Sequence, residues 1–208
     1  KEVSQLNNFI DVGAYKGTYT DLVLNNFKPN KILMFEPQDE IYDYLKKKYS
    51  YNQNIHVFKK ALSNKNENAK FNFNRHNLTS SLSSLDPNNS YLKMKAKLFG
   101  TTSQGMIVDT KTIQTTTLFS VLEKENLETI DFLKVDTEGH ELQVLQGMKE
   151  KIKTIKHLLV EFHNDEIYIS YDPEFLHEYL ISHNFKLIKK FKFPFTTWED
   201  RLYTNLEK

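Results

Sequence analysis

Residues 9–18 read F-I-D-V-G-A-Y-K-G-T, and this stretch decides the fold class. A short apolar run, a loop with one acid and two glycines, and then an amphipathic helix are typical of the start of a nucleotide-binding α/β domain. Gly13 and Gly17 have a G-x-x-x-G spacing, which differs from the G-x-G-x-x-G of dinucleotide sites. Asp11 stands where a pyrophosphate would be repelled. The loop therefore favours a ligand that is neutral or positively charged near this turn.

S-adenosylmethionine meets this requirement, because it carries an ammonium and a sulfonium and no phosphate. Glu36 ends the second predicted strand, about 20 residues after the loop, where an acid accepts hydrogen bonds from ribose hydroxyls. The alternative is that Glu36 only places a favourable charge before the helix that follows Pro37. Ala61 and Leu62 end the third predicted strand, and we expect their backbone groups to frame the adenine. The two glycines have an alternative of their own, as ordinary turn glycines.

Bulk properties narrow the class of protein. The 208 residues are enough for one α/β domain with a sizeable core, and we expect a single domain over residues 1–208. Lys and Arg number 28 against 27 Asp and Glu, which argues against a nucleic-acid partner. Because the chain has no Cys, disulfides, thiolate nucleophiles and Cys-based metal sites are excluded. No apolar run approaches the roughly 20 residues of a membrane span. We expect a cytoplasmic protein without a signal peptide.

The hydrophobic pattern predicts alternating strands and helices around one insert. Strands are predicted at 8–12, 31–36, 55–62, 130–135 and 157–162, and helices at 18–27, 38–49, 118–125, from 139 and at 173–183. This order predicts a parallel sheet with right-handed crossovers, closed by an antiparallel pair at 185–193 and 196–204. The insert at about 63–117 is predicted to hold a hairpin, a loop and a short helix at 91–99. It is a candidate lid or substrate surface.

Acids end four of the predicted strands, namely Asp11, Glu36, Asp136 and Glu161. Because ligands of open α/β sheets bind beyond the carboxyl ends of the strands, we expect these acids to gather around one site. Any single one could instead be a solvated loop residue or a helix cap. Four at the same edge favour a binding site.

The densest group of chemically active residues is K-V-D-T-E-G-H-E, residues 134–141. Asp136 or Thr137 could cap the following helix, and Glu138 would favour the positive end of that helix. Capping does not explain His140, which is a poor choice for a first helical turn. We predict that His140 is a general base for a hydroxyl, with Asp136 or Glu138 orienting it or the acceptor. The alternative is an ordinary surface histidine.

Glu161 and His163 lie on one face of the fifth predicted strand, because strand side chains alternate with a period of two. We predict that both contact the substrate. A divalent metal held by Asp136 and Glu161 is an alternative that we do not favour. In the insert, further candidate ligand contacts are Asn77, Ser80 and Ser81, although polar loop residues are usually just solvated.

Together these motifs resemble the FkbM family of S-adenosylmethionine-dependent methyltransferases. The resemblance is carried by F-I-D-V-G-A-Y-K-G-T-Y-T (9–20), F-E-P (35–37), A-L-S (61–63), D-F-L-K-V-D-T-E-G-H-E-L-Q-V-L-Q-G (131–147) and V-E-F-H-N (160–164). It implies a class I methyltransferase fold, with a Rossmann-like, mostly parallel seven-stranded sheet and helices on both faces. The implied strand order is 3-2-1-4-5-7-6, with the last strand antiparallel.

The resemblance also implies methyl transfer to oxygen, commonly to a hydroxyl of a sugar or natural product. By position, the cofactor-binding residues would be Asp11, Gly13, Gly17, Thr18, Glu36, Pro37, Ala61, Leu62 and Asp136. The residues facing the methyl group and the acceptor would be Asp136, Glu138, His140, Glu161 and His163.

Two other functions remain open on the sequence alone. One is a non-catalytic module that binds S-adenosylmethionine and acts through a partner. The other, weaker one is a nicotinamide-dependent oxidoreductase, which the glycine spacing disfavours. The aromatic residues Phe191, Phe193, Phe195 and Trp198 could stack on a sugar or pack between two copies in a homodimer, although a core or strand-pair role is the simpler interpretation.

Overall fold

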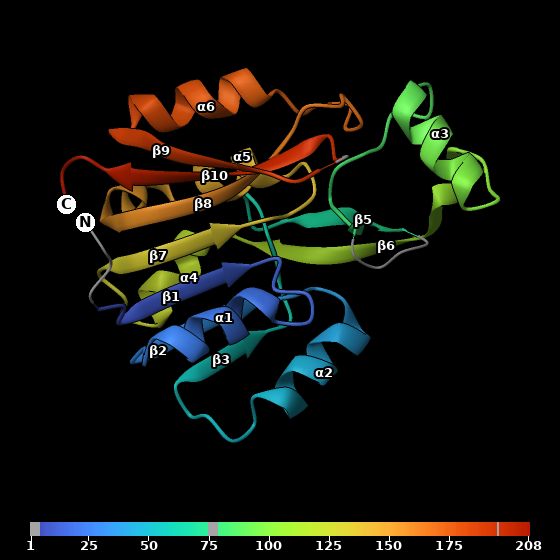
Figure 1. Ribbon diagram of the computed structural model, residues 1–208. Helices are drawn as coiled ribbons and strands as arrows, with labels where there is room; N and C mark the ends of the chain where they lie inside the picture. The colour runs from blue at the N-terminus through green and yellow to red at the C-terminus, as the bar shows by residue number, and fades with distance from the viewer. Residues whose placement is uncertain (1–4, 75–78, 195) are drawn as a thin grey trace.

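A seven-stranded sheet forms the centre of the protein in the computed structural model, which describes residues 5–74, 79–194 and 196–208 (Figure 1). The strands are β1 (Asn8–Val12), β2 (Lys31–Phe35), β3 (Ile55–Phe58), β7 (Ile130–Val135), β8 (Ile155–His163), β9 (Phe185–Lys192) and β10 (Trp198–Asn205). Their order in the sheet is β3-β2-β1-β7-β8-β10-β9. Counted along the chain within this sheet, the order is 3-2-1-4-5-7-6, as expected. The last strand, β10, runs antiparallel to both of its neighbours.

Helices cover both faces of this sheet, as expected (Figure 1). On one face lie α4 (Leu118–Lys124), α5 (Glu141–Gln146) and α6 (Pro173–Ser182), and on the other lie α1 (Thr18–Asn26) and α2 (Asp39–Lys48). The central strands are buried on both faces, which explains their almost continuous apolar sequences. A 3-10 helix, η3 (Lys149–Thr154), leads into β8. No helix in the described part of the chain combines the length and the apolarity that crossing a bilayer requires.

The predicted third strand at 55–62 is wrong at its end. β3 stops at Phe58, and the chain then leaves the central sheet at the exposed Lys59 and Lys60. Ala61–Leu62 forms a separate strand, β4, which pairs with β6 (Ile107–Thr116) in a second sheet of order β4-β6-β5, where β5 is Asn68–Asn74. Two consecutive lysines next to the core do not suit a strand that is covered by helices, because their charged ends must stay in water.

The insert lies beyond the carboxyl ends of the parallel strands (Figure 1). Besides β5 and β6 it contains α3 (Ser90–Leu98) and the 3-10 helix η2 (Gln104–Met106). Leu92 and Ala96 of α3 pack with Met106 against Ile167 and Tyr168, which belong to the loop after β8. The insert and this loop therefore build a common wall over the sheet edge. Asn77 and Phe195 lie outside the described residues.

The helix predicted from Gly139 begins two residues later, at Glu141. Glu138 and Gly139 have φ values of 57° and 87°, a left-handed conformation that cannot continue an α-helix. His140 occupies the N-cap position without a side-chain cap. The loop before α5 is therefore longer than predicted, and Asp136 and Thr137 do not cap the helix.

Candidate active site

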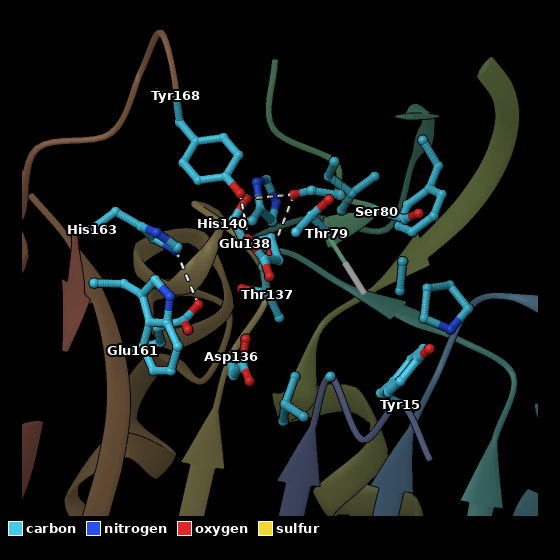
Figure 2. Close-up of a pocket in the computed structure, with 18 of the residues that line it drawn as sticks. Tyr15, Thr79, Ser80, Asp136, Thr137, Glu138, His140, Glu161, His163 and Tyr168 are labelled. Atoms are coloured by element: carbon cyan, nitrogen blue, oxygen red, sulfur yellow. Dashed lines mark hydrogen bonds and ion pairs between the residues drawn. The ribbon is translucent and has the colours of Figure 1, made fainter. Parts of the chain in front are cut away.

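A pocket of about 350 Å³ opens at the carboxyl ends of the parallel strands (Figure 2). The predicted site residues that line it are Gly13, Glu36, Pro37, Ala61, Leu62, Asp136, Glu138, His140, Glu161 and His163. The insert contributes Ser80 and Ser81 to the same wall. Among the described residues, Asp11, Gly17 and Thr18 are predicted site residues that do not line the pocket. One cavity thus gathers residues from both halves of the sequence.

Glu36 forms one end of the pocket and is almost fully buried. Its two carboxylate oxygens each accept a backbone hydrogen bond, from the Tyr15 N–H at 3.1 Å and from the Gln38 N–H at 2.9 Å. Burial raises the pKa of Glu36 to about 7, although these hydrogen bonds act in the opposite direction. The two N–H groups fix the carboxylate at the pocket wall, where its remaining lone pairs can accept hydrogen bonds from a ligand.

Gly13 brings the loop after β1 into contact with the end of β7. Its φ is +72°, and a Cβ atom at this position would lie 1.7 Å from the backbone oxygen of Asp136. Only glycine fits such a close approach. Gly17 contacts Tyr49 instead: its carbonyl oxygen accepts a hydrogen bond from the Tyr49 hydroxyl at 2.9 Å. Gly13 therefore shapes the pocket directly, whereas Gly17 contacts Tyr49 at the C-terminal end of α2, outside the pocket lining.

Lys134 is a buried cation that joins the two loops, and the sequence analysis did not single it out. Its Nζ donates to the Gly13 carbonyl oxygen at 2.9 Å and lies 3.1 Å from Asp136 Oδ2 and 3.5 Å from Asp11 Oδ1. Burial alone would lower the pKa of Lys134, but the carboxylates of Asp136 and Asp11 more than offset this, and the pKa is raised. Asp11, fully buried, also accepts a hydrogen bond from Thr20 Oγ1 at 2.8 Å. Asp11 thus supports the pocket from behind.

We expect Lys134→Met to lower the free energy of unfolding by about 3–5 kcal/mol, because it leaves Asp11 as an uncompensated buried charge. The double variant Lys134→Met/Asp11→Asn should recover a large part of this loss. Urea unfolding followed by circular dichroism measures both changes. The matched control is Lys59→Met, which removes an exposed lysine paired with Asp39 and should leave the unfolding midpoint unchanged. An equal loss in the single and double variants would contradict this account.

Glu138, Glu161 and His163 meet at the other end of the pocket, and we call these three residues the acceptor cluster (Figure 2). Glu161 and His163 share a face of β8, as predicted, and Glu161 Oε2 lies 3.0 Å from His163 Nε2. Tyr168 donates a hydrogen bond to Glu138 Oε2 at 2.5 Å. Figure 2 shows Tyr15 on the opposite side of the pocket from Glu161 and His163.

The pKa values of the two carboxyl groups in the acceptor cluster are strongly raised. Burial, together with the nearby carboxylates of Asp136 and Glu141, raises the pKa of Glu161 well above its ordinary value. Burial and the charge of Glu161 do the same to the pKa of Glu138. Buried carboxylates with strongly shifted pKa values are characteristic of functional sites.

Hydrogen bonds hold the loop that carries Glu138. Ser81 Oγ lies 2.8 Å from the carbonyl oxygens of both Thr137 and Glu138, so this serine of the insert fastens the loop. From the other side, Glu141 Oε1 accepts from the backbone N–H groups of Thr137 at 2.8 Å and Gly139 at 3.1 Å. The left-handed φ of Glu138 is therefore kept by surrounding contacts, a form of strain that concentrates at functional sites.

His140 makes its hydrogen bond with a residue outside the acceptor cluster. Its Nε2 makes a hydrogen bond with Ser63 Oγ at 3.0 Å, and burial lowers the pKa of His140 to about 4. A general base works best when its pKa lies near the working pH. The prediction that His140 is the base stays a prediction, and its surroundings suit a residue of the pocket wall better.

Sequence reasoning missed Lys134 and Tyr168, of which Tyr168 lines the pocket. A lysine within an otherwise apolar buried strand could have drawn attention to Lys134, because buried charges are normally paired. The segment of Tyr168 shows no strand or helix periodicity, so no pattern pointed to it. Trp198, for which the sequence left sugar stacking open beside a core role, packs against the ring of Phe193 with centroids 4.4 Å apart and also lines the pocket.

The sheet order, the glycine loop and the pocket position define a class I methyltransferase fold. The Methyltransferase FkbM domain model matches residues 11–187, and the chain belongs to this family. No curated protein matches the chain.

Solved structures of low sequence identity share the fold. The methyltransferase FkbM of Methylobacillus flagellatus KT aligns with a TM-score of 0.60 at 15% identity, over 96% of this chain and 43% of that one. M. capricolum TrmK in complex with S-adenosyl-homocysteine gives 0.55 at 9% identity, over 97% and 63% of the two chains. Streptococcus pneumoniae Sp1610 in complex with S-adenosyl-L-methionine gives 0.55 at 11% identity, over 98% and 68%. The chain thus spans less than half of the matched FkbM protein and 63% of TrmK.

Proposed function

We propose that this chain is an S-adenosylmethionine-dependent O-methyltransferase that acts on a hydroxyl of a sugar or natural product. The observation that carries the proposal is a single pocket with two chemically different ends. Glu36 presents a fixed carboxylate at one end, and the acceptor cluster presents two carboxylates and an imidazole at the other. A cofactor that carries ribose and a hydroxyl-bearing acceptor match these two ends.

The residues of the first end fit S-adenosylmethionine. Two backbone N–H groups and the Gln38 side chain use part of the acceptor capacity of Glu36, and the rest is available to the ribose hydroxyls. Gly13 has no side chain, and any Cβ would collide with the Asp136 backbone at the place where the loop borders the pocket. Asp136, held by Lys134, offers a negative charge to the cationic methionine portion. Ala61 and Leu62 contribute an apolar wall for the adenine.

When bound, the cofactor supplies a methyl group on a sulfonium, and methyl transfer forms a carbon–oxygen bond while the carbon–sulfur bond breaks to leave S-adenosylhomocysteine. The protein must orient the acceptor oxygen and take up the hydroxyl proton, so that the oxygen keeps its electron pair for the new bond. We assign both tasks to the acceptor cluster. Burial raises the pKa of Glu138 and Glu161, which makes their carboxylates stronger proton acceptors. General base catalysis of this kind contributes about 10²–10⁴-fold.

The charge of the acceptor cluster favours a hydroxyl over an amine. Carboxylates beside an amine would stabilise its protonated form, which has no free electron pair and cannot accept a methyl group. A hydroxyl stays neutral in the same surroundings and donates its hydrogen to a carboxylate. The aromatic rings of Tyr168 and Trp198 in the same pocket suit the apolar faces of a sugar or polyketide-like acceptor.

A binding module without catalysis is the second candidate. It would keep Glu36 and the glycine loop but would have no use for buried carboxylates at the far end. Burying charged groups without a function is costly, which is why the acceptor cluster favours an enzyme.

The test combines calorimetry with a labelled methyl donor. We expect S-adenosylmethionine and S-adenosylhomocysteine to bind and NAD, the control, not to bind. S-adenosylmethionine with a deuterated methyl group is then incubated with pools of monosaccharides and hydroxylated natural products. Mass spectrometry should find the label in an ether. Label on nitrogen would overturn O-methylation, and a folded protein that binds neither compound would overturn the enzyme proposal.

A further inference from the structure

Three potential metal ligands converge in the acceptor cluster from two neighbouring segments. Glu138 comes from the loop after β7, and Glu161 and His163 come from β8. One oxygen of each carboxylate and one ring nitrogen all lie within 4.8 Å of one another. Atoms bound to one ion at about 2.0–2.2 Å are separated from each other by about 3–4 Å, so small side-chain adjustments would complete a shared site.

Two of these ligand atoms are buried and have no hydrogen-bond partner among the described residues. They are Glu161 Oε2 and His163 Nε2, and the two side chains are only 9% and 6% exposed. The atoms lie 3.0 Å apart, but their geometry makes no hydrogen bond. Buried polar atoms are nearly always satisfied, and the interaction given for these two atoms is the ion pair with each other beside the pocket, so a metal ion would satisfy both.

Supporting contacts orient the ligands. The Tyr168 hydroxyl donates to Glu138 Oε2, which leaves the other oxygen of this carboxylate for an ion. The rings of Tyr168 and Tyr171 pack edge-on against the His163 ring, with centroids 4.9 Å and 5.5 Å away. The hydrogen bond from Tyr168 is of the kind that orients metal ligands, and the two rings limit the movement of the imidazole.

The local charge also favours a cation. Asp136 and Glu141 place two further carboxylates near Glu161. Lys134, the buried cation nearby, is already held by Gly13, Asp11 and Asp136. Asp136, which the sequence analysis named as an alternative metal ligand, is therefore paired with a lysine and lies outside the set of three.

We propose that Glu138, Glu161 and His163 bind a divalent transition-metal ion. Two carboxylates and one imidazole suit Mn²⁺, Fe²⁺ or Zn²⁺ better than Mg²⁺ or Ca²⁺, which prefer oxygen ligands alone. Three protein ligands leave coordination positions open toward the pocket. The catalytic part of this inference rests on the proposed function: an acceptor hydroxyl bound at an open position would have a lowered pKa, and with Glu138 and Glu161 acting as ligands its proton would pass to water instead of to their carboxylates.

The test uses Mn²⁺ as the probe and the full chain after treatment with EDTA and dialysis. The electron paramagnetic resonance signal of free Mn²⁺ should fall as one ion binds per chain with a micromolar dissociation constant, while excess Mg²⁺ should displace it poorly. We expect His163→Gln and Glu138→Gln to weaken binding by at least about tenfold. Glu138 is partly exposed, so its variant keeps the test valid if His163→Gln does not fold. His183→Gln, outside the pocket, is the matched control.

Absence of Mn²⁺ and Zn²⁺ binding by the folded wild type, or equal affinity in all variants, would overturn the metal site. Its failure is distinguishable from failure of the proposed function. S-adenosylhomocysteine binding and methyl transfer that continue at the full rate in excess EDTA would reject the catalytic ion and keep the methyltransferase. Mn²⁺ binding by a chain that does not bind S-adenosylmethionine would keep the metal site and reject the methyltransferase.

Discussion

Glu36→Gln is expected to weaken the binding of S-adenosylmethionine and S-adenosylhomocysteine by about 10- to 100-fold, the range for losing hydrogen bonds to a charged group. The amide keeps the size of the side chain. Its NH₂ group, however, faces one of the two backbone N–H groups, of Tyr15 or Gln38, whose hydrogen bonds the carboxylate accepts. It also offers fewer acceptors to the ribose hydroxyls. Isothermal titration calorimetry measures the change for both ligands.

The pH dependence provides a second readout for the same residue. Because the pKa of Glu36 is raised to about 7, the carboxylate takes up a proton as the pH falls below this value. We expect the cofactor to bind the ionised form, so the wild-type affinity should fall by up to about tenfold per pH unit below pH 7. The Glu36→Gln variant should lack this step. Glu40→Gln, an exposed acid on α2, is the control and should behave as the wild type.

Unchanged affinity in the folded Glu36→Gln variant would show that the ribose does not bind here. Thermal unfolding of both variants tests whether the fold is kept. A loss of affinity that appears equally in Glu40→Gln would point to a general effect of charge on α2.

The second large effect is expected at the acceptor cluster. Glu161→Gln should lower kcat for methyl transfer by about 10²–10⁴-fold while S-adenosylhomocysteine binds with little change. Glu161 lies at the end of the pocket away from Glu36, and it is the member of the cluster that contacts His163. The variant removes a negative charge that either accepts the hydroxyl proton or holds an ion, and its neutral amide does not take up the proton and binds an ion more weakly. Rates of S-adenosylhomocysteine formation with an identified acceptor measure the effect.

Glu178→Gln is the matched control, because Glu178 is an exposed acid of α6 outside the pocket. Its rate should equal that of the wild type. A Glu161→Gln variant with the full rate would remove the acceptor cluster from the mechanism and would return His140 to consideration as the base. If only KM rose, Glu161 would bind the acceptor without acting on its proton.

The position of the insert has a consequence for acceptor choice. Ser81 fastens the loop of Glu138, and Tyr91, from α3, lines the same pocket. The insert therefore lines the pocket and is also attached to the loop that carries Glu138. Changes in the insert should alter acceptor selection and the geometry of Glu138 together.

Local sequence determined much of this protein. The acid and glycine loop after an apolar strand indicated the class of ligand, and alternation along β8 placed Glu161 and His163 on one face. The alternation along β8 is confirmed, because strand periodicity fixes side-chain directions over short distances, while the class of ligand stays a prediction. The strand order followed from the resemblance of the motifs to a family, and the sheet confirms it.

Other features depended on the tertiary structure. Two contacts join segments that are distant in sequence: the hydrogen bond between His140 and Ser63, and that between Tyr168 and Glu138. The end of β3 at Phe58 separates the chain after it from the central sheet. Asp11 shows the reason most clearly. Its type and place at a strand end predicted a ligand contact, yet the fold buries it behind the pocket beside Lys134. Periodicity tells which way a side chain points, but long-range packing decides what it meets there.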